Sequence, residues 1–267
     1  MHDTLPINNT DVPESYVGAW RKCSDTEHAF WLQSHRLHAS LNIPAQRPDF
    51  SGRQSWADFS DGELMQLAQQ GGVAGACIAQ GDILHRRRQI DYLPRRGEPY
   101  LRRMQRDGMQ LAEATLDGRE SCVWELLTDA QQEIVALRFQ DAGIGQDSDD
   151  QRKGYLLVIG DYFLFVRDRV VFTQQAASLA VLAECKGLNR AQLIELLDFE
   201  ISFGTRPAGD APWLIQLSTI PYREGRTLLD NPTLHGIAGA AQSGPHPLRW
   251  GAKNYLRYWS LDEWQKI

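Results

Sequence analysis

The chain of 267 residues contains no long apolar segment, and this absence excludes several classes of protein. The longest apolar run of its second half, Tyr155 to Ile159, is far too short to cross a bilayer. The stretch from Met1 to Ser15 is polar and lacks the apolar core of a secretory leader. We therefore expect a cytoplasmic protein with no membrane partner.

Cysteine and net positive charge are also scarce. The chain has four cysteines without a Cys-x-x-Cys pair, which predicts reduced thiols in a protein that is not secreted. Its formal net charge is −6. Phosphate binding needs a concentrated positive surface, so we expect no nucleic-acid partner.

Familiar catalytic signatures are missing as well. The sequence has no Gly-x-Ser-x-Gly elbow, P-loop, Gly-x-Gly-x-x-Gly or His-Glu-x-x-His motif. His35 and His38 form the only close histidine pair, and residues three apart in a strand point to opposite faces, so they cannot share a metal. An enzyme would require another cluster, such as His85, Asp91 and Tyr92. We expect a non-catalytic protein with no cofactor and no metal.

An internal repeat is the clearest feature that is present. The order of features in the first half is Phe30–Leu37, Ser60–Leu64 and Val123–Trp124, and in the second half it is Leu164–Val170, Asn189–Leu193 and Tyr258–Trp259. The same order with altered spacing predicts a duplicated domain. We expect domains at residues 15–128 and 129–267, with the polar stretch Asp141–Lys153 near their boundary.

Local patterns predict mostly strands. Residues 30–43, 83–92, 109–114, 121–127, 133–139, 155–172, 199–203, 213–220 and 255–261 have strand character. Two short helices are predicted at matching places, because Ser60-x-x-Glu63 forms a capping box and Asn189-x-x-Gln192 repeats its logic. Many short strands with one helix per half favour a mainly β protein with two tandem antiparallel barrels.

Two resemblances bear on this expectation. Gly18-Ala19-Trp20 is similar to the Gly-x-Trp that opens the first strand of lipocalins and related calycin barrels, where the Trp closes the barrel bottom. Segments 30–32, 41–44, 154–160 and 201–204 resemble the Hri family of two-barrel proteins, known in fungi as partners of a casein-kinase-type enzyme. The resemblance implies two lipocalin/calycin-like barrels and brings no catalytic motif.

The two halves differ at one strand. His85–Gln89 is polar on both faces, whereas its counterpart Trp213–Leu217 is largely apolar. Alternation places Arg86 and Arg88 on one face and Arg87 on the other, so an arginine faces the interior in either orientation. A buried guanidinium needs a carboxylate or an anionic ligand.

These observations lead to a ligand-binding hypothesis. We expect Arg36 and Arg88 to hold the acidic group of a small acidic or amphipathic ligand in the first barrel. Trp31 and Tyr92 would flank its apolar part, and His85 is a further ligand-binding candidate. One alternative is an edge strand whose solvated arginines pair with Asp82, Asp91 or Glu98. Another is a protein-interaction module in which both barrels are filled and the surfaces bind a protein partner.

Overall fold

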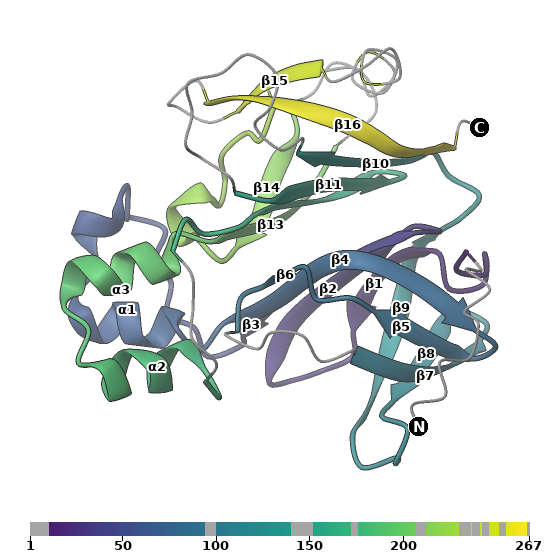
Figure 1. Cartoon of the computed structure of the whole chain (residues 1–267), viewed down its shortest axis with the longest axis horizontal. Coiled ribbons are helices and arrows are strands. Elements are labelled where there is room, and N and C mark those ends of the chain that lie inside the picture. The colour runs from purple at the N-terminus through teal and green to yellow at the C-terminus, as the bar shows by residue number, and fades with distance from the viewer. Residues whose placement is uncertain are drawn as a thin grey trace, which may run out of the picture.

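The structure, a computed structural model, combines a closed β-barrel, a second β-sheet and a small group of helices beside both (Figure 1). It describes residues 11–93, 100–139, 152–171, 176–206, 212–229, 236, 241, 246–250 and 255–265. The predicted mainly β class is confirmed. Within these residues, none of the helices has the length and apolar character needed to cross a bilayer.

Eight strands of the first half close into an antiparallel barrel. They follow one another as β1, β2, β3, β4, β5, β7, β8 and β9, and β9 returns to pair with β1, while the short β6 pairs with β4. The bounds are β1 (Gly18–Lys22), β2 (Glu27–Gln33), β3 (Leu37–Pro44), β4 (Gly71–Gln80), β5 (Ile83–Arg86), β6 (Ile90–Asp91), β7 (Tyr100–Asp107), β8 (Gln110–Ala114) and β9 (Ser121–Asp129).

Closure depends on β4, which pairs with β3 through Gly71–Ala76 and with β5 through Cys77–Gln80. Beyond β5 the chain stays close to β4, and the amide of Arg87 donates to the carbonyl of Ala76 at 2.8 Å. Gly75 makes this approach possible, because a Cβ there would lie 2.1 Å from the Arg87 carbonyl oxygen. The glycine is therefore a steric requirement of the barrel wall.

The second sheet has seven strands in the order β14-β13-β12-β11-β10-β16-β15. The bounds are β10 (Ile134–Phe139), β11 (Gly154–Ile159), β12 (Tyr162–Arg167), β13 (Glu200–Thr205), β14 (Leu214–Ser218), β15 (His246–Trp250) and β16 (Tyr255–Gln265). We expected this half to close as a barrel. Among the described residues its end strands β14 and β15 do not pair with each other, so the sheet is open there. The predicted boundary Asp141–Lys153 lies outside the described residues except for Arg152 and Lys153.

Three short α-helices lie at one end of both sheets (Figure 1): α1 (Asp61–Leu67), α2 (Leu179–Lys186) and α3 (Arg190–Leu197). Both predicted capping boxes are confirmed, since Ser60 accepts from the Glu63 amide and Asn189 accepts from the Gln192 amide. The helix α2, capped by Ser178, was not predicted. Helices α1 and α3 pack together, and Arg190 of α3 donates to Asp61 of α1 at 2.6 Å.

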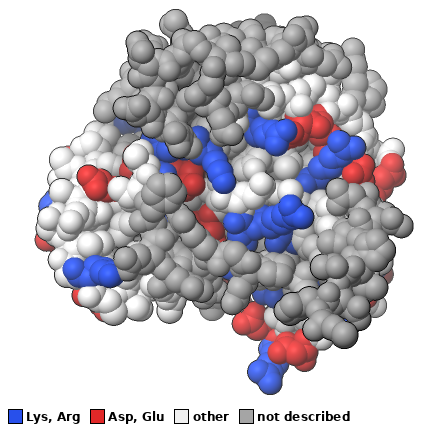
Figure 2. Space-filling view, in the orientation of Figure 1, with Lys and Arg blue, Asp and Glu red and all other residues white. Residues whose placement is uncertain are grey.

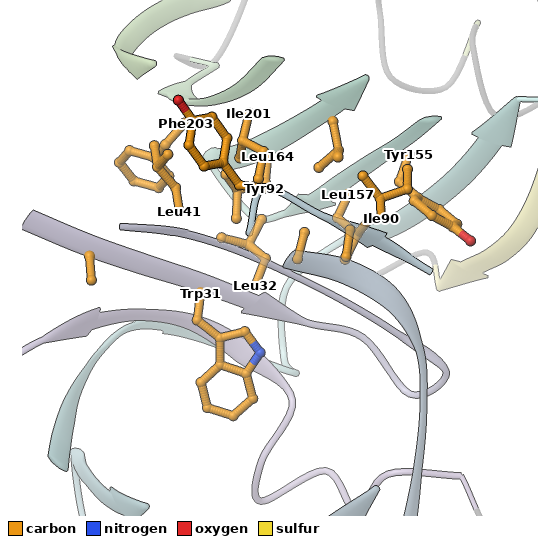
Figure 3. Packing of buried hydrophobic residues seen from close by; sticks show 14 of the residues in the cluster. Trp31, Leu32, Leu41, Ile90, Tyr92, Tyr155, Leu157, Leu164, Ile201 and Phe203 are labelled. Atoms are coloured by element: carbon orange, nitrogen blue, oxygen red, sulfur yellow. The ribbon is translucent and has the colours of Figure 1, made fainter. Parts of the chain in front are cut away.

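The second sheet packs against the outside of the barrel wall formed by β2, β3 and β4. Figure 3 shows Leu32 and Leu41 pointing toward Leu164 and Phe203, while Trp31 points the opposite way, into the barrel. This follows from the alternation of side chains along a strand. Phe30 stacks on Phe203 with ring centroids 3.8 Å apart. The other face of the second sheet carries a separate apolar cluster, which includes Phe165, Trp213 and Trp259.

Candidate ligand site in the barrel lumen

The lumen of the barrel contains a cavity of about 600 Å³. Its walls include residues of all nine strands β1 to β9, and Gln46, Gln69 and Glu120 are exposed at one end, where the cavity opens. The described lining residues are Lys22, Thr26, Glu27, Trp31, Ser40, Asn42, Pro44, Gln46, Gln69, Gln70, Gly71, Gly72, Val73, Arg86, Arg88, Asp91, Leu93, Tyr100, Arg102, Glu113, Glu120, Cys122 and Trp124. A cavity of this size is typical of a small-molecule site.

The opposite end of the barrel is filled by apolar side chains. Trp20, Leu84, Met104 and Leu111 are buried, and each lies two residues from a cavity-lining residue on its own strand, so it shares the inner face. The indole of Trp20 stacks on that of Trp31, with ring centroids 6.0 Å apart. The guanidinium of Arg106 lies over the Trp20 ring, 5.4 Å from its centroid. The cavity therefore has a closed floor and one open mouth.

Glu113 is the central acid of the cavity wall. Its carboxylate accepts from Arg86 at 3.1 and 3.4 Å and from the indole nitrogen of Trp124 at 2.8 Å, and Arg102 lies 3.2 Å away. The side chains of Arg86 and Glu113 are only 6% and 4% exposed. One carboxylate therefore serves two guanidinium groups.

Arg88 has a weaker partner. Its Nη1 lies 3.5 Å from Asp91, whose other oxygen accepts from the Leu93 amide at 2.9 Å. The Arg88 guanidinium also lies over the ring of Tyr100 at 4.4 Å, and Arg102 lies over the same ring at 3.7 Å. At the depth of these groups, three guanidinium ions face two carboxylates, Glu113 and Asp91. The lining has two further acids. Glu120 accepts from Arg102 at 3.3 Å, but its side chain is 76% exposed, so water screens it, and Glu27 pairs with Lys22.

Three buried N–H groups of this wall have no hydrogen-bond acceptor among the described residues. They are the indole Nε1 of Trp31, the Nε of Arg86 and the Nε of Arg88. Trp31 and Arg86 are in contact, since the Arg86 guanidinium lies 4.1 Å from the Trp31 ring centroid. Buried donors in proteins are nearly always paired, so these three are unusual. None of the three atoms is exposed to water, so an acceptor from outside the chain reaches them only when a neighbouring side chain of the wall moves.

The pKa of His38 is lowered in the same region of positive charge. It lies on the inner face of β3, two residues from Ser40, and burial, followed by the charges of Arg86 and Arg88, lowers its pKa to about 3. Its Nε2 lies 3.3 Å from the Arg87 carbonyl oxygen and its Nδ1 has no partner among the described residues. The ring is therefore neutral over the physiological range.

Two of the five sequence-predicted site residues, Trp31 and Arg88, line the cavity. Arg36 lies in the turn between β2 and β3, where its side chain is 64% exposed and pairs with Asp11. Tyr92 lies on the outer side of the wall, toward Leu164 of the second sheet (Figure 3), and is fully buried. Its hydroxyl donates to the Leu67 carbonyl, and its ring packs on Phe199. His85 precedes the inward Arg86 on β5 and is not among the lining residues.

The edge-strand alternative does not describe β5, because this strand pairs with β4 on one side and β7 on the other. Glu98 lies outside the described residues. Sequence reasoning missed Tyr100, Arg102 and Glu113, which belong to strands β7 and β8. The signal was present in Arg102 and Met104, whose spacing places a charge and an apolar side chain on one face.

Charges of both signs are mixed among the described residues on one face of the molecule. On the face in Figure 2, blue Lys and Arg side chains lie close to red Asp and Glu side chains. The pairs Arg21–Glu125 and Arg103–Asp82 are examples of exposed ion pairs. In the part of the chain that the structure describes, no group of three or more His, Cys, Asp or Glu side chains is arranged to hold a metal ion.

Comparisons with known proteins show the fold alone. No protein-family model matches the chain, and neither does any curated protein. The structure is similar to the crystal structure of the uncharacterized protein YLR301w from Saccharomyces cerevisiae, with a TM-score of 0.52 and 9% sequence identity. The similarity covers 93% of this chain and 98% of the yeast protein, so it includes both the barrel and the second sheet.

Proposed function

We propose that the protein binds a small anionic molecule in the lumen of the first barrel. The observation that carries this proposal is the group of three guanidinium side chains in the cavity wall, Arg86, Arg88 and Arg102. The buried Nε atoms of Arg86 and Arg88 have no acceptor among the described residues, which supports it. An oxyanion accepts such hydrogen bonds at several lone pairs and is favoured where guanidinium groups are already present.

The charge balance of the wall supports the same proposal. Glu113 is shared between Arg86 and Arg102, and Arg88 has only the long contact to Asp91. A ligand carboxylate, sulfonate or phosphate would give Arg88 a nearer acceptor than Asp91 in a place where water is partly excluded. Binding is the whole of the proposed activity, and no chemical step is assigned to the site.

We also infer that the two units descend from one ancestral barrel. In the first unit, β1 to β5 are neighbours in chain order, with α1 between β3 and β4; in the second, β10 to β14 are neighbours in chain order, with α2 and α3 between β12 and β13. The returning strands also correspond, since β9 pairs with β1 and β16 pairs with β10. A lipocalin/calycin-like ancestry and membership of the Hri family stay predictions.

Native mass spectrometry of freshly purified protein, with chemical extraction of any retained molecule, tests ligand binding. We expect the intact chain to carry or take up one small acid per molecule. Arg88→Met should weaken this binding at least tenfold, because it removes a guanidinium and a donor of the cavity wall. Arg103→Met is the matched control, since Arg103 lies on the barrel exterior with a side chain that is 54% exposed.

Three results would contradict the proposal. One is a barrel that retains nothing and binds none of a broad panel of organic and inorganic anions. The second is anion binding that Arg88→Met and Arg103→Met affect equally. The third is an empty barrel together with a protein partner recovered reproducibly by affinity capture, which would favour the interaction-module hypothesis.

A further inference from the structure

The lining of the cavity restricts the chemistry of the ligand more tightly than its charge alone. Small-molecule sites are usually lined mainly by apolar and aromatic side chains, with a few polar groups that fix orientation. Here the proportions are reversed, because Val73 and Leu93 are the only aliphatic side chains besides Pro44 among the described lining residues. We propose that the ligand is a polyhydroxylated carboxylic acid of single-sugar size, such as a hexuronic acid, an inference that rests on the proposed function.

The aromatic side chains of the wall do not provide an apolar surface for a ligand. The Arg86 guanidinium covers the ring of Trp31 at 4.1 Å, and Trp20 stacks on the same indole. Arg88 and Arg102 lie over Tyr100 at 4.4 and 3.7 Å. A hydrocarbon chain in this lumen would therefore lie against cations and strip water from them, which costs free energy.

The upper wall carries neutral groups that match hydroxyls. Thr26, Ser40, Asn42, Gln46 and Gln69 line the cavity beside the charged groups, and Gln46 and Gln69 lie at its mouth. Such side chains donate and accept hydrogen bonds, as the hydroxyl groups of a sugar do. In the described part of the chain nothing bonds to the Ser40 hydroxyl, and the Asn42 amide nitrogen donates to Glu27 at 2.9 Å, which leaves its carbonyl oxygen as an acceptor.

The vertical order of the groups defines an orientation. The side chains of Arg86 and Arg88 would receive the carboxylate, and Ser40 lies close to them, because it is the register partner of Trp31, whose ring Arg86 covers. Ser40 and Asn42 follow in steps of two along the inner face of β3, which rises from His38 toward the mouth at Pro44. The hydroxyl groups of the bound acid would lie along this strand, one above another. A fatty acid has a carboxylate but nothing to pair with these groups.

Isothermal titration calorimetry of the full chain separates the two classes. The probes are glucuronate, galacturonate and gluconate as hydroxylated acids, laurate as a fatty acid and inorganic phosphate as a bare anion. We expect at least one hydroxylated acid to bind with a stoichiometry of one and at least tenfold more tightly than laurate or phosphate. Ser40→Ala should weaken that acid about fivefold to tenfold and leave laurate unweakened, because it removes the hydroxyl and adds no atoms to the wall.

Arg88→Met and Arg88→Lys complete the test. We expect the Met variant to lose binding of the hydroxylated acid, the Lys variant to recover part of it, and Arg103→Met to bind as the unmodified chain does. Thermal melting of each variant identifies any that fails to fold, and Ser40→Ala then remains as the independent probe.

The possible failures are distinguishable. Laurate bound in an Arg88-dependent way, with no hydroxylated acid bound, would overturn this inference and leave the proposed function in place. Tight binding of phosphate alone would do the same. A hydroxylated acid that binds equally well when Ser40 or Arg88 is replaced would also overturn it, because the acid would then lie elsewhere. If no probe binds and the purified chain is empty, the proposed function itself fails.

Discussion

Replacing Glu113 by glutamine should be among the most destabilising single changes in the barrel. The substitution keeps the shape of the side chain and removes its charge, while Arg86 and Arg102 stay in place with side chains only 6% and 13% exposed. It also replaces a carboxylate oxygen that accepts from Trp124 at 2.8 Å. Removing one partner of a buried ion pair costs about 3–5 kcal/mol, because the other charge stays buried without compensation.

The magnitude is testable by urea unfolding followed by tryptophan fluorescence. Glu113→Gln should lower the free energy of unfolding by about 3–5 kcal/mol, the cost of an uncompensated buried charge. Glu125→Gln on the neighbouring strand should lower it by no more than about 1 kcal/mol, because Glu125 pairs with Arg21 at the surface. The double variant Arg86→Met with Glu113→Leu should regain at least half of the loss, since it removes both buried charges of that pair.

Two outcomes would refute this reasoning. If Glu113→Gln costs no more than Glu125→Gln, the Arg86–Glu113 pair does not behave as a desolvated pair, and the lumen is as wet as the surface. If the double variant is as unstable as the single one, the loss does not come from an unpaired Arg86. Either result would also weaken the argument for a ligand that compensates charge in the lumen.

Two further predictions concern the same wall. Burial, together with the charges of Arg86 and Arg88, lowers the pKa of His38 to about 3. Below roughly pH 6.5 the unfolded chain therefore binds a proton at this histidine that the native chain does not. The free energy of unfolding should fall by about 1.4 kcal/mol for each pH unit below that value. His38→Gln should remove this part of the acid dependence, and His85→Gln should keep it. The measurement is the free energy of unfolding in urea at pH values from about 7 down to about 5. If this free energy falls with pH equally steeply in both variants, the assignment to His38 is wrong. Gly75→Ala should lower the free energy of unfolding by about 1–3 kcal/mol, because its Cβ would lie 2.1 Å from the Arg87 carbonyl oxygen. Gly52→Ala, which meets nothing within 4 Å, is the matched control, and similar losses in the two variants would show that the wall at Gly75 is not closely packed.

The sequence predicted those elements whose signals are local. Both capping boxes identify real helix starts, because side chain and amide lie within one turn of each other. Strands rich in β-branched and aromatic residues, such as β11 and β12, are also recognisable. The closed barrel in the first half follows from many short strands in succession, although its closing pairs are long-range contacts.

Strands β4 and β7 escaped prediction for physical reasons. The sequence of β4 is rich in Gly and Ala, and it is a strand because neighbours on both sides pair with it and leave little space. The charged β7 has strand geometry because Arg102 faces a lumen that holds a carboxylate. Tertiary context of this kind overrides local propensity.

The site residues were also predicted correctly where the signal is local and wrongly where the chain turns or a strand breaks. Alternation correctly places Arg86 and Arg88 on one face, which is the inner one. It fails for Arg36, because the predicted continuous strand turns at residues 34–36. It also fails for Tyr92, which follows the break at Arg87–Gln89 and faces the second sheet. Neither a turn nor a strand break of this kind carries a strong local signal.

The strand β3 has no side that meets solvent along its middle: Ser40 and Asn42 face the lumen, while Leu41 and Ile43 are buried under the second sheet. Cutting the chain after residue 128 would expose the apolar outer face of β3 to water, together with Leu32 and Phe30 of β2 beside it. An excised barrel would therefore associate with its own copies, and the second sheet serves as the cover that keeps this wall from water.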